Sequence, residues 1–403
     1  MSVIAAPANR SNTSIWVAFI LLIVGTLGAY YVVGLTQALL FLIGGALGMT
    51  LYHASFGFTS SWRVFITERR GRGLRAQMIM LALAVLLFFP ALGAGELFGN
   101  PVKGNVSPVS MSVMIGAFIF GIGMQLGGGC ASGTLYTVGS GSMRMIITLV
   151  FFCTGSLIAT THLDWWFNLP HLAPISVVHS LGVAPALVIN FILFALIAFA
   201  TIYFEKKRHG NLEVEPKSQH QGWKRFIRGP WPLVWAGILL TLLNFATLSL
   251  AGRPWGVTSA LAVWAAKTAS FAGIDVASWS YWQQPANAKA LSESLWFDIT
   301  SMMNFGIMLG ALLAASLAGK FAPNFNIPKR SLIAAILGGL LLGYGARLAY
   351  GCNIGAYFSG IASGSVHGWL WLVSAFIGNS IGVKFRPVFF PDERPAPEKL
   401  TGC

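Results

Sequence analysis

Ten stretches of this sequence are apolar over about 20 residues each, which is the length that a helix needs to cross a bilayer. Hydrophobic residues make up 55% of the 403 positions and charged residues only 9%, against about a quarter in soluble domains. The sequence therefore predicts an all-α polytopic membrane protein, and it excludes a soluble globule, a coiled coil or a disordered chain. The apolar runs lie near residues 15–34, 36–53, 75–94, 109–126, 143–162, 181–204, 231–250, 300–319, 331–350 and 366–384.

The basic residues indicate how the chain is oriented. They gather in four connections, and cytoplasmic loops collect Lys and Arg during insertion, so we expect these connections inside the cell. The net charge of +14 is then a consequence of topology, and we expect membrane lipids rather than nucleic acid around the protein. The basic connections lie near residues 63–75, 206–228, 329–330 and 384–386, whereas residues 95–108, 163–180 and 271–298 are poorer in positive charge and are predicted to lie outside.

The two halves of the chain repeat one another. The segment 121–135, GIGMQLGGGCASGTL, aligns without gaps at an offset of 222 with 343–357, GYGARLAYGCNIGAY, and six of the fifteen positions are identical. A second pair of motifs, at 56–60 and 255–259, opens each half. Because the loop around 63–75 and the segment 205–230 are both predicted to be cytoplasmic, these motifs fall at opposite membrane faces, and the repeats are inverted.

We therefore expect two inverted pseudo-symmetric repeats, with about ten membrane helices plus re-entrant half-helices. Such repeats with interrupted helices are typical of transporters that bind substrate near the midplane. The expected segments are an additional membrane helix in residues 1–35, the first repeat in 36–204, a cytoplasmic linker in 205–230, the second repeat in 231–386 and a cytoplasmic tail in 387–403.

The glycine-rich segments within the duplicated motif are the candidate binding site. Irregular backbone at membrane depth survives only where it lines a cavity or packs inside protein, and successive glycine N–H groups followed by a helix start suit an anion. The alternative is that the glycines only permit close helix packing. The residues predicted to bind substrate are Cys130, Cys352, Gly128, Gly129, Gly133, Gly351 and Gly355, with Gln125 and Arg347 as equivalent N–H donors.

Cys130 and Cys352 occupy equivalent positions, which argues for a shared role. A metal site would need further ligands, and a redox pair would need the sulfurs within bonding range; the sequence supports neither. Thiols that face a soft, sulfur-bearing substrate remain. Cys153, within an apolar helix, is expected to be an inert small hydrophobe.

The arrangement resembles the YeeE/YedE sulfur-transport family, through the motifs GGGCASG at 127–133, YGCNIG at 350–355 and RPWGVTS at 253–259. The resemblance implies a thiosulfate importer of the bacterial inner membrane, in which cysteine thiols pass the anion across a thin barrier. It also implies a cytoplasmic sulfurtransferase partner of the TusA type. Family members that import thiosulfate carry a third cysteine where this chain has Gly57. The resemblance therefore leaves open whether a relay of thiols operates here, and whether the anion is thiosulfate or another sulfur or selenium oxyanion.

No cofactor, metal or catalytic residue is expected. The sequence has no phosphate-binding GxxxxGK[ST] motif and no series of carboxylates in its apolar runs. The alternative to a transporter is a membrane-embedded thiol enzyme that transfers sulfur or exchanges disulfides. Such an enzyme would want a base and a resolving cysteine beside its thiolate, and neither cysteine has a His or Lys within a few residues.

Overall fold

All ten predicted membrane spans are present in the computed structural model, which describes residues 12–215 and 221–391. This is a multi-pass membrane protein. The parts of the predicted N-terminal segment, linker and tail in residues 1–11, 216–220 and 392–403 lie outside the described residues. The long helices are α1 (Asn12–Val32), α2 (Leu35–Ala54), α4 (Arg72–Ala94), α5 (Met111–Gly127), α7 (Met143–Thr160), α10 (Val183–His209), α12 (Leu233–Ala251), α16 (Ile299–Leu317), α17 (Lys329–Leu348) and α19 (Val366–Phe389).

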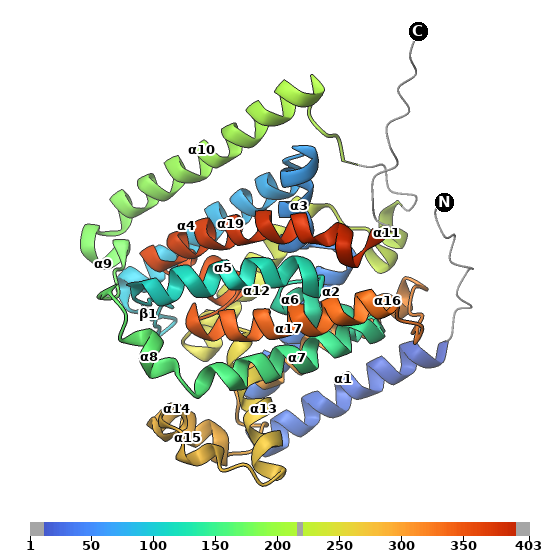
Figure 1. Cartoon of the computed structure of the whole chain (residues 1–403), viewed down its shortest axis with the longest axis vertical. Coiled ribbons are helices and arrows are strands. Elements are labelled where there is room, and N and C mark those ends of the chain that lie inside the picture. Colours follow the sequence, from blue (N-terminus) through green and yellow to red (C-terminus); the bar gives the residue numbers. More distant parts are fainter. Residues whose placement is uncertain (1–11, 216–220, 392–403) are drawn as a thin grey trace.

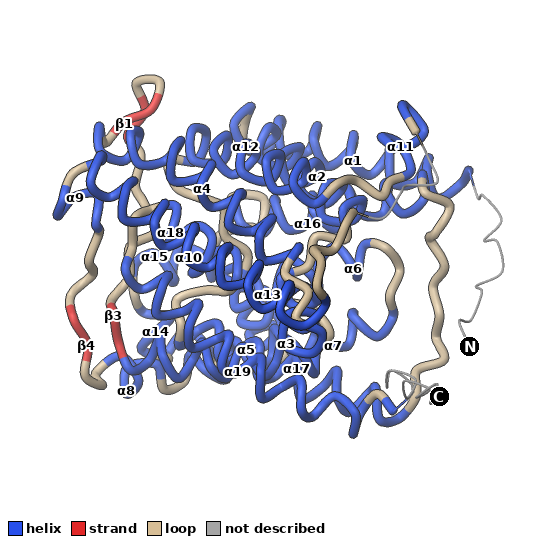
Figure 2. Tube along the Cα trace, turned by 90° about the horizontal axis from the view of Figure 1, so that it is seen from above, coloured by secondary structure: helices blue, strands red, loops and turns tan. Residues whose placement is uncertain are grey.

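Eight of the long helices form two rows, and short helices lie between them. In one row α19, α5, α17 and α7 pack side by side, and in the other α16, α2, α12 and α4 do so. Figure 2 shows α5, α19 and α17 along one side of the molecule and α12 and α2 along the other. The short helices contact both rows; they are α3 (Phe58–Glu68), α6 (Ala131–Gly139), α13 (Thr258–Phe271) and the π-helix η2 (Asn353–Phe358) with α18 (Ser359–Ala362).

Most of the helix pairs recur when the two halves are exchanged. The pair α5–α19 corresponds to α17–α7, the pair α4–α12 to α16–α2, and the contact of α3 with α19 to that of α13 with α7. The outer helix α1 lies on α16 as α10 lies on α4. In Figure 1, α1 begins at the right near the N-terminus whereas α10 begins at the left beside α9, so the two run in opposite directions, as inverted repeats require.

Glycines allow the long helices to touch backbone to backbone. A Cβ added at Gly48 would lie 2.0 Å from the carbonyl oxygen of Ile307, and one at Gly343 would lie 2.1 Å from that of Phe152. Small residues at such crossings are typical of membrane helices, which associate by close packing rather than by the hydrophobic effect. Gly343, at the start of the duplicated motif, is one of these packing glycines.

The two ends of the bundle differ in their connecting segments. One end, which we call the basic end, carries the α3–α4 turn, residues 205–215 and α11 (Gly222–Arg228). The opposite end carries two short antiparallel strand pairs that the sequence does not predict, as Figure 2 shows. The elements of that end are β1 (Glu96–Leu97), β2 (Asn100–Pro101), β3 (Val109–Ser110), α8 (Leu163–Phe167), β4 (His171–Leu172), α9 (Val177–Leu181), the 3₁₀ helix η1 (Val276–Ser278), α14 (Ser280–Gln283) and α15 (Pro285–Ser292).

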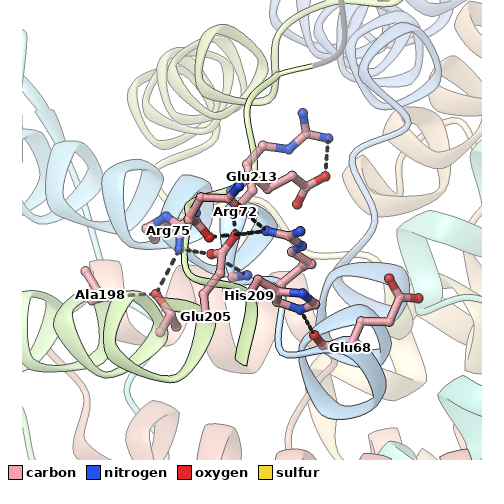
Figure 3. Close-up of polar contacts among 11 residues, drawn as sticks. Glu68, Arg72, Arg75, Ala198, Glu205, His209 and Glu213 are labelled. Carbon is pink, nitrogen blue, oxygen red and sulfur yellow. Dashed lines mark hydrogen bonds and ion pairs between the residues drawn. The ribbon is translucent and has the colours of Figure 1, made fainter. Parts of the chain in front are cut away.

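A buried carboxylate fastens the segment after α10 to the α3–α4 turn (Figure 3). The Glu205 side chain has no exposed surface and accepts hydrogen bonds from Arg75 Nη1 at 2.6 Å and Arg70 Nη1 at 3.3 Å. It also accepts from the backbone N–H groups of Gly71 at 3.1 Å and Glu213 at 2.6 Å. Burying a charge is costly unless it is paired and hydrogen-bonded, and here four hydrogen bonds compensate it.

Candidate functional site

The two cysteine-bearing breaks lie against each other in the space between the rows. Cys130 is the N-cap residue of α6 and Cys352 the N-cap residue of η2, and α6 contacts η2 directly. Both side chains are buried, with 2% and 0% of their surface exposed. Two segments 222 residues apart in the sequence therefore place their thiols on the two sides of one contact.

Backbone N–H groups of the first helical turn lie near both sulfur atoms. The Cys130 sulfur interacts with the N–H groups of Gly133 and Ser132, and the Cys352 sulfur with those of Gly355 and Ile354. The Ser132 hydroxyl also lies 3.4 Å from the Cys130 sulfur. These N–H groups have no partner within a first helical turn and carry the positive end of the helix dipole. Each thiol thus has N–H donors nearby, while its burial opposes a negative charge on the sulfur itself.

The glycines before each cysteine produce the breaks. Gly128 ends α5 with φ of +91°, and Gly351 follows α17 with φ of +149°. Residues other than glycine rarely adopt either backbone conformation, and a Cβ at Gly351 would also lie 2.8 Å from the backbone nitrogen of Ala356. Glycine is therefore required at both positions to turn the chain into the following short helix.

A positively charged pocket of about 340 Å³ opens beside Cys352 at the end opposite the basic end. Lys103, Arg253 and Arg347 line it, and Gly351 and Gly355 contribute its wall next to the cysteine. No acidic residue lines this pocket. Asp298 lies outside the lining but close enough to Arg253 to interact with it electrostatically, so the pocket keeps an excess of positive charge that attracts a small anion to the approach to Cys352.

Arg347 is held in this pocket by neutral groups. Its Nη1 donates to the Tyr281 hydroxyl and its Nη2 to the Thr258 hydroxyl, both at 3.2 Å. Its Nε is buried and has no partner among the described residues. Because its partners carry no charge, the positive charge of Arg347 remains available to an anion.

A second pocket, of about 310 Å³, lies at the basic end beside the break between α2 and α3. Hydroxyl groups of Ser55, Ser60 and Ser61 line it, together with three arginines. Here two glutamates form ion pairs, Arg72 with Glu213 at 3.6 Å and Arg225 with Glu215 at 2.9 Å. Residues on both sides of the undescribed stretch, in 205–215 and 221–231, thus border this pocket, and Glu213 and Glu215 balance much of its charge.

Gln125 does not match its repeat equivalent, Arg347. Its Nε2 donates to the carbonyl oxygen of Thr59 at 3.2 Å and to Asn379 Oδ1 at 2.9 Å, so both amide hydrogens are already used. The cationic pocket therefore has Arg347 but not its repeat equivalent in its wall, and it combines Lys103 of the first half with Arg253 and Arg347 of the second. Gly133 and Gly129 lie in the first repeat beside Cys130, where a Cβ at Gly133 would be 3.5 Å from the sulfur.

Sequence reasoning missed two parts of this site. Lys103 comes from a loop expected to be poor in positive charge, and that exception to the charge pattern was a usable signal. Asn353 directly follows Cys352 and is fully buried. The first repeat has Ala131 at the equivalent position, so the sequence itself shows a polar side chain in only one copy of the motif. Within residues 12–215 and 221–391, no group of three or more His, Cys, Asp or Glu side chains could hold a metal ion.

Comparison with known proteins gives one family for nearly the whole chain. The profile of the family described as sulphur transport matches residues 53–381. A thiosulfate transporter, TsuA, of Spirochaeta thermophila is 29% identical over 84% of this chain and 95% of its own length. TsuA of Escherichia coli is 24% identical over 83% of this chain and 90% of its own length.

A third relative matches only part of the chain. The probable transporter YedE of Escherichia coli is 30% identical over 40% of this chain and 39% of its own length. The family match covers both halves, both broken segments and both opening motifs. The chain therefore belongs to the sulphur transport family and is a membrane transporter for a sulfur-containing anion.

Proposed function

We propose that this chain imports thiosulfate through a passage between Cys130 and Cys352. The anion enters from the positively charged pocket that Arg347 lines and moves towards the basic end. The observation that carries the proposal is the pair of buried thiols, each at the start of a short helix, on two helices that contact each other. The basic end is taken as cytoplasmic because Lys and Arg collect there, in a bacterial inner membrane. The segments expected from the sequence, with repeats in 36–204 and 231–386, belong to this proposal.

The chemistry of the passage suits a divalent anion that must bind and then leave. An unpaired charge in a low-dielectric interior costs tens of kcal/mol, so the backbone N–H groups of Gly133 and Gly355 supply donors on either side of the contact. Thiols are weak donors. Conduction requires sites that bind well enough to admit an ion and weakly enough to release it, and two S–H groups in succession meet that requirement.

Gly57, which stands where family members carry a third cysteine, precedes α3 beside the pocket at the basic end. We infer that two thiols suffice, and that the hydroxyl groups of Ser55, Ser60 and Ser61 complete the route. A TusA-like sulfurtransferase that accepts the sulfur at this end is the expected partner. Another sulfur or selenium oxyanion is the alternative substrate.

The first test is growth on thiosulfate as the sole sulfur source. The host is a bacterium without its own sulfate and thiosulfate importers, and it carries the intact chain, Cys352→Ala or Cys153→Ala. Cys153 is the matched control, since it lies on α7 outside the contact between the two breaks. Growth with the intact chain and Cys153→Ala, and loss of growth with Cys352→Ala, supports the proposal. Equal growth of all three strains refutes the role of the thiol.

A further inference from the structure

Asn353 stands out among the buried polar side chains of the described residues. It has no exposed surface, and neither its Nδ2 nor its Oδ1 has a hydrogen-bond partner there. Other buried asparagines are better satisfied: Asn190 bonds to Ala186 and Trp369, and Asn379 accepts from Gln125. An unmade hydrogen bond on a buried polar group costs about 1–3 kcal/mol, so a fully unpaired amide in the membrane interior needs a reason.

The position of Asn353 supplies one. It directly follows Cys352 and begins η2, whose first N–H groups approach the Cys352 sulfur. The fifth residue of η2, Tyr357, also has a buried hydroxyl without a partner among the described residues. The Tyr357 ring lies against Phe58 and Trp62 of α3. Two residues of η2, within five positions of Cys352, thus carry buried polar groups without a partner among the described residues.

The local backbone is adapted to this arrangement. The N–H groups of Ala356 and Tyr357 both bond to the carbonyl oxygen of Cys352, which is the widened turn of a π-helix. Such turns are rare and occur frequently at functional sites. The first repeat instead forms the regular helix α6 and has Ala131 in place of Asn353.

We infer that Asn353 is a substrate-binding residue that donates hydrogen bonds from Nδ2 to the oxygen atoms of the permeating anion while the Cys352 thiol contacts its sulfur. This inference rests on the proposed transport of a sulfur oxyanion and deepens it. A site built to hydrogen-bond its substrate rejects analogues that lack the bonding group, because its own buried groups are then left unpaired. Asn353 therefore favours oxyanions over anions without oxygen, such as hydrosulfide.

The test uses Asn353→Leu and Asn353→Ser, with Asn190→Leu as the matched control, in full-length protein purified and reconstituted into lipid vesicles. Two quantities are measured: the initial rate of radiolabelled thiosulfate uptake per folded protein, and the thermal unfolding midpoint. Replacing an unpaired polar group by an apolar one of similar shape is neutral or stabilising. Asn353→Leu should therefore keep or raise the midpoint while uptake falls about tenfold, an effect of about 1.4 kcal/mol.

The control should behave in the opposite way. Asn190→Leu breaks two existing hydrogen bonds, and we expect a lower midpoint with uptake per folded protein unchanged. Asn353→Ser keeps a hydroxyl donor and should retain more uptake than Asn353→Leu. A fall in midpoint with Asn353→Leu as large as that of the control would show a structural role and overturn the inference, as would unimpaired uptake. If the unsubstituted protein carries no thiosulfate, the proposed function itself fails.

Discussion

Replacing Glu205 by alanine should destabilise the protein strongly, because one side chain joins three segments. Its carboxylate accepts hydrogen bonds from two arginines and two backbone N–H groups and has no exposed surface. Removing one partner of a buried ion pair costs about 3–5 kcal/mol. Arg70 and Arg75 are 25% and 18% exposed and regain water in the variant, so we expect the lower value, about 3 kcal/mol.

The assay is thermal unfolding of the purified protein in detergent. At about 2 °C per kcal/mol for a large domain, Glu205→Ala should lower the unfolding midpoint by about 6 °C. Glu215→Ala is the control, since Glu215 is 46% exposed and pairs with Arg225. Exposed ion pairs contribute about 0–1 kcal/mol, so its midpoint should fall by less than about 2 °C. Equal shifts in the two variants would refute the assignment of Glu205 as the residue that fastens the segment 205–215.

Two further predictions concern the pocket beside Cys352. A Cβ at Gly355 would meet open space, so Gly355→Val should obstruct uptake and leave the unfolding midpoint unchanged. Gly343→Ala would collide with the backbone of Phe152 and should instead lower the unfolding midpoint. The reverse pattern would contradict the packing described. Arg347→Ala should reduce the uptake rate at all salt concentrations, whereas Lys103→Ala should reduce it mainly at low salt, where exposed charges act at long range. Uptake is measured between about 0.05 and 0.5 M salt. Identical salt profiles for the two variants would refute the different roles of Arg347 and Lys103.

The sequence predicts the fold well because each span carries its own signal. All ten apolar runs correspond to spans in the structure, since a lipid-facing helix must be apolar along its whole length. The duplicated motif predicts the symmetry through residues that repeat in both halves, such as Cys130 and Cys352. The half-helices α3 and α13 were harder to foresee. A break in hydropathy shows that a helix is interrupted, but not how far the chain continues into the membrane after the interruption.

The candidate site is less accessible to sequence reasoning because it depends on contacts between distant residues. The pocket combines Lys103 from the α4–α5 loop with Arg253 and Arg347 from the second half, and no local pattern links them. Gln125 was expected to donate to an anion, yet Asn379, 254 residues further along the chain, accepts one of its hydrogens. Asn353 was overlooked because the lack of a hydrogen-bond partner becomes apparent only in three dimensions.

The central claim is that the anion passes between two thiols, and flux through the purified protein tests it most directly. Uptake of radiolabelled thiosulfate into lipid vesicles is compared for the unsubstituted protein, Cys130→Ala, Cys352→Ala and Cys153→Ala, each normalised to folded protein. We predict that Cys130→Ala and Cys352→Ala each lose most of the flux, whereas Cys153→Ala retains it. Full flux in both Cys130→Ala and Cys352→Ala would contradict the account, and the passage would then have to be sought elsewhere in the bundle.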